Sequence, residues 1–128
     1  MSVLLDTHAA LWLVQGDDRL SRAALSRIEG LAHDEIFISD LALFELALLI
    51  TKRRVVINEA LDRFLNDFAA HFQMLPLDAT IATKAVELKL AQGDPFDRIF
   101  VATAIRHKLP FVTRDRPIRD SGLVRTIW

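Results

Sequence analysis

Cysteine is absent from this chain of 128 residues, and no run of apolar residues is long enough to cross a lipid bilayer. The first absence excludes disulfide bonds and thiolate metal sites. The second argues against a membrane protein, although hydrophobic residues make up 52% of the chain. Asp6 interrupts the first apolar run and no basic segment precedes it, which argues against an N-terminal targeting segment. We therefore expect a cytoplasmic protein.

Glycine is scarce, and neither sign of charge is in excess. The four glycines are isolated, so the chain has no glycine-rich phosphate loop, and this argues against a nucleotide cofactor. The 16 Lys and Arg residues nearly balance the 17 Asp and Glu residues. Such a balance gives no general attraction to nucleic acid, so any such binding would depend on a local patch or on metal ions. The four histidines have no ligand-pair spacing, so a zinc site is not expected.

Short apolar segments alternate with segments of helical periodicity, and no linker separates them. A chain of this length is expected to form one domain over residues 1–128. The expected strands are Val3–Leu5, 35–39, 74–77, 111–113 and 123–128. The expected helices are one through Trp12, one capped by Ser21, 41–52 capped by Asp40, one capped by Asn58 and running to Phe72, 79–91 capped by Asp78, and 95–107 capped by Asp94. This alternation predicts an α/β fold whose parallel sheet is covered on both faces.

Acidic residues recur near the carboxyl ends of the predicted strands, where α/β proteins commonly have their active sites. Asp6 and Asp115 follow predicted strands, Glu45 lies in an otherwise apolar helix, and Asp97 lies in the first turn of another. Each has an ordinary structural alternative: a helix cap, a loop acid, a partly exposed side chain or a charge that complements a helix dipole. If all four meet beyond the carboxyl ends of the strands, neighbours about 5 Å apart repel by roughly 3 kcal/mol at an effective dielectric constant near 20. A divalent cation such as Mg²⁺ or Mn²⁺ would offset that repulsion.

Four segments, in order, resemble the motifs of PIN domains and, within them, the VapC toxins of bacterial type II toxin–antitoxin systems. They are LLDTHAALW at 4–12, ISDLALFEL at 38–46, DPFDR at 94–98 followed by Ala102 and Ala104, and VTRD at 112–115. The resemblance covers the whole chain. It implies a three-layer α/β/α fold with a five-stranded parallel sheet of order 3-2-1-4-5. It also implies a homodimer and a small VapB-type antitoxin that blocks the site.

The same resemblance implies a Mg²⁺- or Mn²⁺-dependent endoribonuclease that hydrolyses RNA phosphodiester bonds through a metal-activated water. The catalytic and metal-binding acids would be Asp6, Glu45, Asp97 and Asp115. The segment at 38–46 departs from the family pattern in having Ala42 and Phe44 where Ser and Trp are frequent, but neither position carries an acid. Asp94 is the alternative to Asp97, and the register set by the two alanines favours Asp97.

Several residues near the acids are candidate substrate contacts. Thr7 and Thr113 are placed to hold a water or a phosphate oxygen. The arginines expected near the mouth of the site are Arg98, Arg114, Arg116 and Arg119, which would bind RNA phosphates. For each arginine, a solvated surface charge is the ordinary alternative. The apolar run at 41–50 is the place expected to meet a dimer partner or an antitoxin helix.

Two other functions fit parts of the pattern. A catalytically silent PIN-like scaffold that only binds RNA or protein would keep the fold but lose acids, and all four are present. A haloacid-dehalogenase-like phosphatase needs a second Asp two residues after the first, and His8 occupies that position. A metal-dependent RNA cleavage assay separates the nuclease from the scaffold, and a phosphomonoester assay tests the phosphatase.

Overall fold

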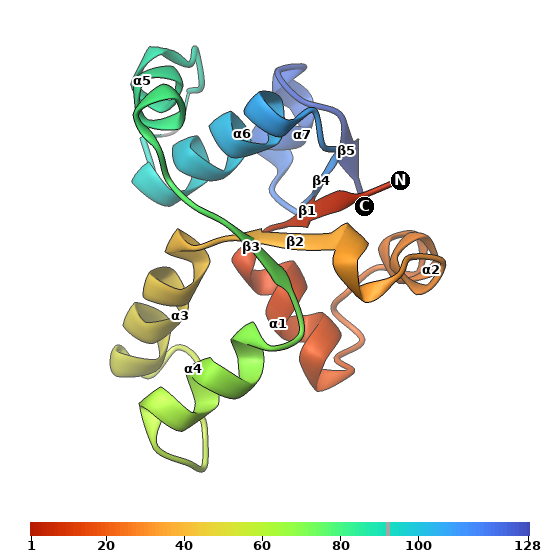
Figure 1. Ribbon diagram of the computed structural model, residues 1–128, viewed down its shortest axis with the longest axis vertical. Coiled ribbons are helices and arrows are strands. Elements are labelled where there is room, and N and C mark those ends of the chain that lie inside the picture. The colour runs from red at the N-terminus through yellow and green to blue at the C-terminus, as the bar shows by residue number, and fades with distance from the viewer. Residues whose placement is uncertain (92) are drawn as a thin grey trace.

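The protein is described by a computed structural model that covers residues 1–91 and 93–128. Its centre is a five-stranded, wholly parallel sheet of order β3-β2-β1-β4-β5 (Figure 1). The strands are β1 (Val3–Leu5), β2 (Ile36–Ser39), β3 (Gln73–Leu75), β4 (Phe111–Val112) and β5 (Thr126–Ile127). The predicted α/β class and the strand order implied by the family resemblance are confirmed.

Helices cover both faces of the sheet (Figure 1). On one side lie α1 (Thr7–Gln15), α2 (Arg22–Glu29), α3 (Leu41–Thr51) and α4 (Leu61–Ala69), and on the other α5 (Ala79–Glu87), α6 (Pro95–His107) and α7 (Arg116–Ser121). A short 3₁₀ helix, η1 (His33–Glu35), leads into β2. Right-handed crossovers require this division, because the chain winds outward from β1 to β3 and then crosses back to β4 and β5. Within the described ranges, no helix has the length and apolar character needed to span a membrane.

The central strand β1 is the most deeply buried part of the sheet. Val3, Leu4 and Leu5 are at most 1% exposed, as expected for three consecutive apolar residues with neighbours on both faces. Beyond the strand, the Asp6 N–H donates to the Val112 carbonyl oxygen at 3.0 Å. The backbone of Asp6 is therefore fixed to β4 at the carboxyl edge of the sheet.

Three predicted helix caps are confirmed. Ser21, Asp78 and Asp94 each accept a backbone N–H in the first turn of the following helix, at 2.8 to 3.1 Å. Two predicted caps are wrong. The helix expected after Asn58 begins only at Leu61, and the Asp40 carboxylate caps nothing in α3. That carboxylate instead accepts the Leu77 N–H at 3.2 Å, a partner 37 residues away that local sequence does not reveal.

Two helix boundaries differ from expectation. Helix α5 ends at Glu87 instead of residue 91, because the Arg98 guanidinium turns the chain there by donating to the carbonyl oxygens of Ala85, Leu88 and Leu90 at 3.2, 2.9 and 2.9 Å. Helix α7 was not expected at all. It has only six residues and is sustained by its cap, Asp115, more than by any periodic pattern.

Replacing Arg98 with Met should destabilise the protein by about 2 kcal/mol, because three carbonyl oxygens lose a charged donor. Urea unfolding of R98M measures the loss. The matched variant is R106M on the exposed end of the same helix, which should change the free energy of unfolding by less than about 0.5 kcal/mol. Equal effects of the two substitutions would show that the guanidinium does not hold the end of α5.

Candidate active site

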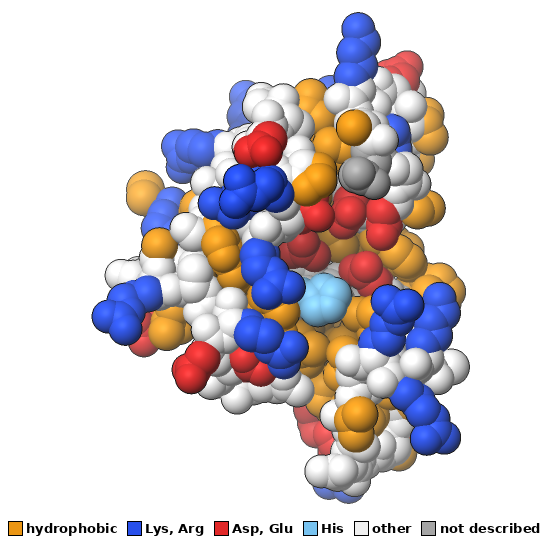
Figure 2. Space-filling model, turned by 180° about the vertical axis from the view of Figure 1, so that it is seen from behind, with side chains coloured by type: hydrophobic (Ala, Val, Ile, Leu, Met, Phe, Trp, Pro, Cys, Tyr) orange, Lys and Arg blue, Asp and Glu red, His pale blue; other side chains and the backbone are white. Residues whose placement is uncertain are grey.

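The predicted acids meet in one cavity of about 230 Å³ at the carboxyl edge of the sheet. Its acidic lining residues are Asp6, Glu45, Asp94, Asp97 and Asp115. Figure 2 shows acidic side chains gathered in a hollow on one face of the molecule, with a histidine beside them and basic side chains along its flanks. The cavity brings together four segments that lie far apart in the sequence.

Each acid is placed by the element that carries it. Asp6 follows β1 directly, and Glu45 lies in the second turn of α3, after β2. Asp97 lies in the first turn of α6, where Asp94 is the capping residue. Asp115 precedes α7, and its carboxylate accepts the Ile118 N–H at 3.0 Å. The ordinary capping role therefore applies to Asp115, whereas the Asp6 side chain caps no N–H of α1.

Thr113 connects two of the acids. Its hydroxyl donates to Asp6 Oδ2 at 2.8 Å and accepts the Asp115 N–H at 3.1 Å. The residue is fully buried, so this hydroxyl has a structural task. In this structure Thr113 orients Asp6 instead of presenting its hydroxyl to a substrate.

Two buried side-chain oxygens lack hydrogen bonds, one on the lining residue Glu45 and one on Thr7, which follows the lining residue Asp6 but does not itself line the cavity. Thr7 Oγ1 and Glu45 Oε1 are shielded from solvent and have no partner among the described residues. Leaving such a group unpaired costs about 1–3 kcal/mol. An unpaired buried oxygen of this kind calls for a ligand or a water, and Glu45 is placed to offer its oxygen to the cavity. Among the described residues, Arg114 is the predicted substrate-contact residue that lines the cavity, whereas Thr7 is fully buried beside it.

The candidate arginines separate into two groups. Arg114 lines the cavity, and its guanidinium lies 4.7 Å from the centre of the Trp12 ring. Arg116 and Arg119 are exposed on α7 and are not among the residues that line the cavity. Arg98 is held at the end of α5, so the structure does not place it for the RNA contact expected of it.

His8, Ala9 and Trp12 complete the lining, and none of them was among the predicted site residues. The spacing of the four histidines had only argued against a zinc site. The position of His8 two residues after Asp6, in the first turn of α1, was the available signal. Such a side chain necessarily lies at the same edge of the sheet as the acid that precedes the helix.

The family model of the PIN domain matches residues 3–121. The chain belongs to the PIN domain family. It is 36% identical over 130 residues to Ribonuclease VapC22 of Mycobacterium tuberculosis, covering 99% of this chain and 98% of that protein. It resembles DNA-bound VapBC from Salmonella typhimurium with a TM-score of 0.74, 19% identity, and coverage of 98% and 96%. It also resembles DNA-bound VapBC2 from Rickettsia felis, with a TM-score of 0.72 and 19% identity over 98% of this chain and 97% of that one.

Burial dominates the electrostatics of this PIN domain's cavity. It raises the pKa of Asp6, against the hydrogen bond from Thr113 and the nearby charge of His8. Burial also raises the pKa of Glu45 to about 7; the Thr7 hydroxyl lies near enough to oppose this slightly, although the two groups do not form a hydrogen bond. Charged Asp6 adds to the increase at Glu45.

Asp97 is affected most by its neighbours. Burial raises its pKa to about 8, and the charges of Asp6, Asp94, Asp115 and Glu45 all act in the same direction. Without a cation, the cavity therefore retains protons at neutral pH. Because these carboxyls bind protons more tightly in the folded than in the unfolded state, folding stability falls as the pH rises from about 4 to about 8.

The residues fit a hard divalent cation. Carboxylate and hydroxyl oxygens are the ligands that Mg²⁺ and Mn²⁺ prefer, and a cation would offset both the burial and the repulsion that raise the pKa values. Among residues 1–91 and 93–128, however, no three acidic or histidine side chains are already arranged as a metal cluster. Binding a cation thus requires some of the carboxylates to rotate toward one another.

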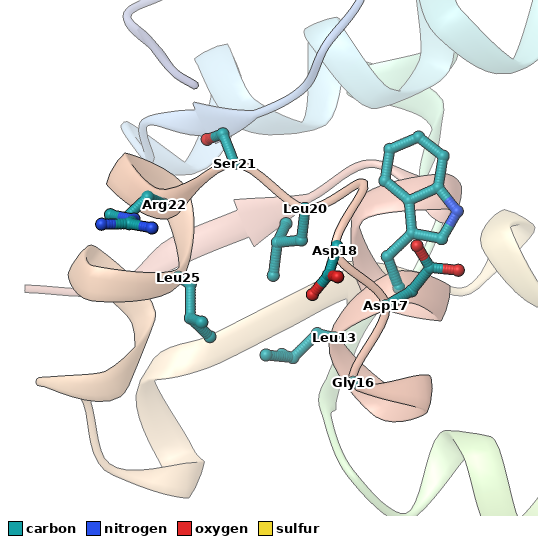
Figure 3. Close-up of a pocket in the computed structure, with 9 residues that line it drawn as sticks. Leu13, Gly16, Asp17, Asp18, Leu20, Ser21, Arg22 and Leu25 are labelled. Carbon is teal, nitrogen blue, oxygen red and sulfur yellow. The ribbon is translucent and has the colours of Figure 1, made fainter.

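A larger hollow of about 560 Å³ lies between α1 and α2 (Figure 3). The side chains of Leu13, Leu20 and Leu25 converge on its floor, and Asp17 and Asp18 lie on the loop beside it. The Arg19 guanidinium beside Asp17 lowers the pKa of that carboxyl, and the two buried unpaired oxygens found among the described residues lie elsewhere. Despite its greater volume, the hollow has the chemistry of a docking surface and lacks that of a catalytic site.

The variant D97N tests whether repulsion governs the cavity. In EDTA at pH 8 it should melt higher than the parent, because one buried negative charge is gone, and the difference should shrink as the pH falls toward 5. On adding Mn²⁺ it should gain less stability than the parent, because a ligand is missing. Thermal melts over this pH range, with and without metal, measure both effects.

The matched control is D62N, which removes an exposed acid from the first turn of α4. There the carboxylate complements a helix dipole and accepts the Arg63 N–H at 2.9 Å, a role that the Asn oxygen keeps. The variant should therefore lose at most about 1 kcal/mol in EDTA and respond to Mn²⁺ as the parent does. If D97N behaves like D62N, Asp97 is a helix-start acid and not a ligand.

Proposed function

We propose that this PIN domain is a Mg²⁺- or Mn²⁺-dependent endoribonuclease and the toxin of a VapBC-type toxin–antitoxin system. The observation that carries the proposal is the single cavity that holds Asp6, Glu45, Asp97 and Asp115. The raised pKa values of Asp6, Glu45 and Asp97 are typical of groups arranged for function. The 36% identity to Ribonuclease VapC22 supports RNA as the substrate.

In this proposal the four acids would hold the cation, with Asp6 oriented by Thr113. A bound cation would lower the pKa of a water and stabilise the charge that develops at phosphorus. Arg114, stacked on Trp12, would hold a nonbridging oxygen of the scissile phosphate in place. The buried Thr7 hydroxyl, which lies near the Glu45 carboxylate, would donate to it and orient it in the way that Thr113 orients Asp6.

Replacing Asp6 with Asn should lower RNA cleavage roughly 100-fold or more, because a ligand charge is lost at almost unchanged shape. The Asn carbonyl oxygen can still accept from Thr113, so the fold should be retained. Cleavage of an RNA oligonucleotide, with Mg²⁺, with Mn²⁺ and with EDTA, measures the effect, and D62N is the control. If the folded protein binds RNA but does not cleave it under any of these conditions, it is the silent scaffold instead.

The proposal also includes an antitoxin partner and a homodimer. Similarity to VapBC complexes supports the partner. An amphipathic antitoxin helix would bury its apolar face on Leu13, Leu20 and Leu25, and a basic side chain would reach the acids and block the site. The exposed Phe44 and Val86 offer apolar surface for the dimer.

The variant L25D should weaken the complex with the co-expressed antitoxin at least 10-fold while leaving RNA cleavage by the isolated toxin unchanged, because a charge would enter an apolar contact. L61D is the matched control, since both leucines are 37% exposed and Leu61 lies on α4, outside the hollow. Affinity measured by surface plasmon resonance decides. Equal losses in both variants would contradict docking on this hollow.

A further inference from the structure

A second cavity, of about 210 Å³, adjoins the acidic one. The two share His8 and Trp12 in their walls. The other lining residues of the second cavity are Leu11, Gln15, Arg19, Arg54, Val55 and Val56. Apart from His8, its ionisable lining residues are arginines, and none is acidic. We name it the basic cavity, because the sign of its charge is opposite to that of its neighbour.

Arg19 is held in position before any ligand arrives. Its guanidinium donates to both carboxylate oxygens of Asp17, at 3.1 and 2.8 Å, and lies 5.2 Å from the centre of the Trp12 ring. Trp12 thus contacts two guanidinium groups, that of Arg19 in the basic cavity and that of Arg114 beside the acids. A guanidinium fixed in this way loses little entropy when it meets an anion.

Arg54 is directed to the basic cavity by a tight turn at the end of α3. Its N–H donates to the Leu49 carbonyl oxygen at 2.9 Å, and the preceding residue, Arg53, has a φ of 59°. A left-handed conformation is unfavourable at a residue other than glycine, because the Cβ atom crowds the backbone. Backbone strain of this kind is found most often at functional sites, where it fixes the position of neighbouring side chains such as that of Arg54. Among the described residues, the Arg54 side chain has no ion-pair partner.

We propose that the basic cavity binds a backbone phosphate of the RNA next to the phosphate that is cleaved. This inference rests on the proposed nuclease function and adds a substrate subsite to it. A strand whose scissile phosphate lies at the acids and Arg114 would pass His8 and Trp12 into a cavity of about 210 Å³ that is lined by Arg19 and Arg54. Paired and unpaired arginines there offer the planar donors that phosphate oxygens accept.

An RNA phosphate fits this cavity better than a protein partner does. An antitoxin helix needs a long apolar groove, whereas the basic cavity is small and several of its lining residues are polar. The hollow between α1 and α2 offers the apolar floor that such a helix requires. An acidic side chain of the antitoxin could also bind these arginines, and the experiment below distinguishes that contact from an RNA phosphate.

The test compares R54Q with R63Q, which removes the same charge from a residue on α4 that lines neither cavity. Binding of a single-stranded RNA oligonucleotide is measured by fluorescence anisotropy across salt concentrations, and kcat and KM are measured with the active metal. R54Q should weaken binding about 10-fold and raise KM by a similar factor with kcat nearly unchanged. The slope of log affinity against log salt should fall by about 0.7. R54K should recover most of the binding, and R63Q should match the parent.

A neutral methylphosphonate in place of each flanking phosphate in turn identifies the contact. One position should weaken binding by the parent protein and have no effect on R54Q. Unchanged RNA binding in R54Q, or an equal loss in R63Q, overturns the subsite. If R54Q instead weakens only the antitoxin complex, the cavity recognises protein and the inference is wrong. Since binding and cleavage are read separately, a protein that binds RNA through Arg54 without cleaving it would refute the nuclease function alone.

Discussion

The burial of several carboxylates close together, and the repulsion between them that burial strengthens, is the constraint on which the organisation of this protein depends. Five acids line one small cavity, and burial together with neighbouring charge raises the pKa of Glu45 to about 7 and that of Asp97 to about 8. A sequence selected for stability alone would replace such groups with apolar residues. A cavity that keeps these carboxylates has a high affinity for positive charge. This affinity is the physical basis for proposing a cation site in the acidic cavity.

The rest of the fold supports that arrangement. The strand β1 is fully buried, so Asp6 projects from the most rigid part of the sheet, and Thr113 orients its carboxylate. The amino-terminal ends of α6 and α7 point toward the cavity with Asp97 and Asp115, where the helix dipoles partly offset negative charge. Trp12 carries one arginine beside the acids and another in the basic cavity. The Trp12 ring therefore lies between the acidic cavity, which repels anions when no cation is bound, and the basic cavity, which attracts them.

Much of the fold and of the acidic site followed from local features of the sequence. Three consecutive apolar residues predicted a doubly buried strand, and Glu45 was conspicuous in an apolar helix. What the sequence did not reveal depends on contacts between distant segments. The length of α5 is set by Arg98, and Asp40 bonds to Leu77 instead of capping its own helix. The basic cavity joins Arg19 and Arg54, whose spacing carries no motif.

The most direct measurement of the central claim is the number of protons released when Mn²⁺ binds, obtained by titration calorimetry at pH 7 in buffers of different ionisation enthalpy. Because Glu45 and Asp97 hold protons near neutral pH in the metal-free state, the repulsion account predicts release of about one proton per ion, falling as the pH rises above 8. D97N should bind Mn²⁺ more weakly and release fewer protons. Binding without proton release, at an affinity that D97N leaves unchanged, would contradict the account.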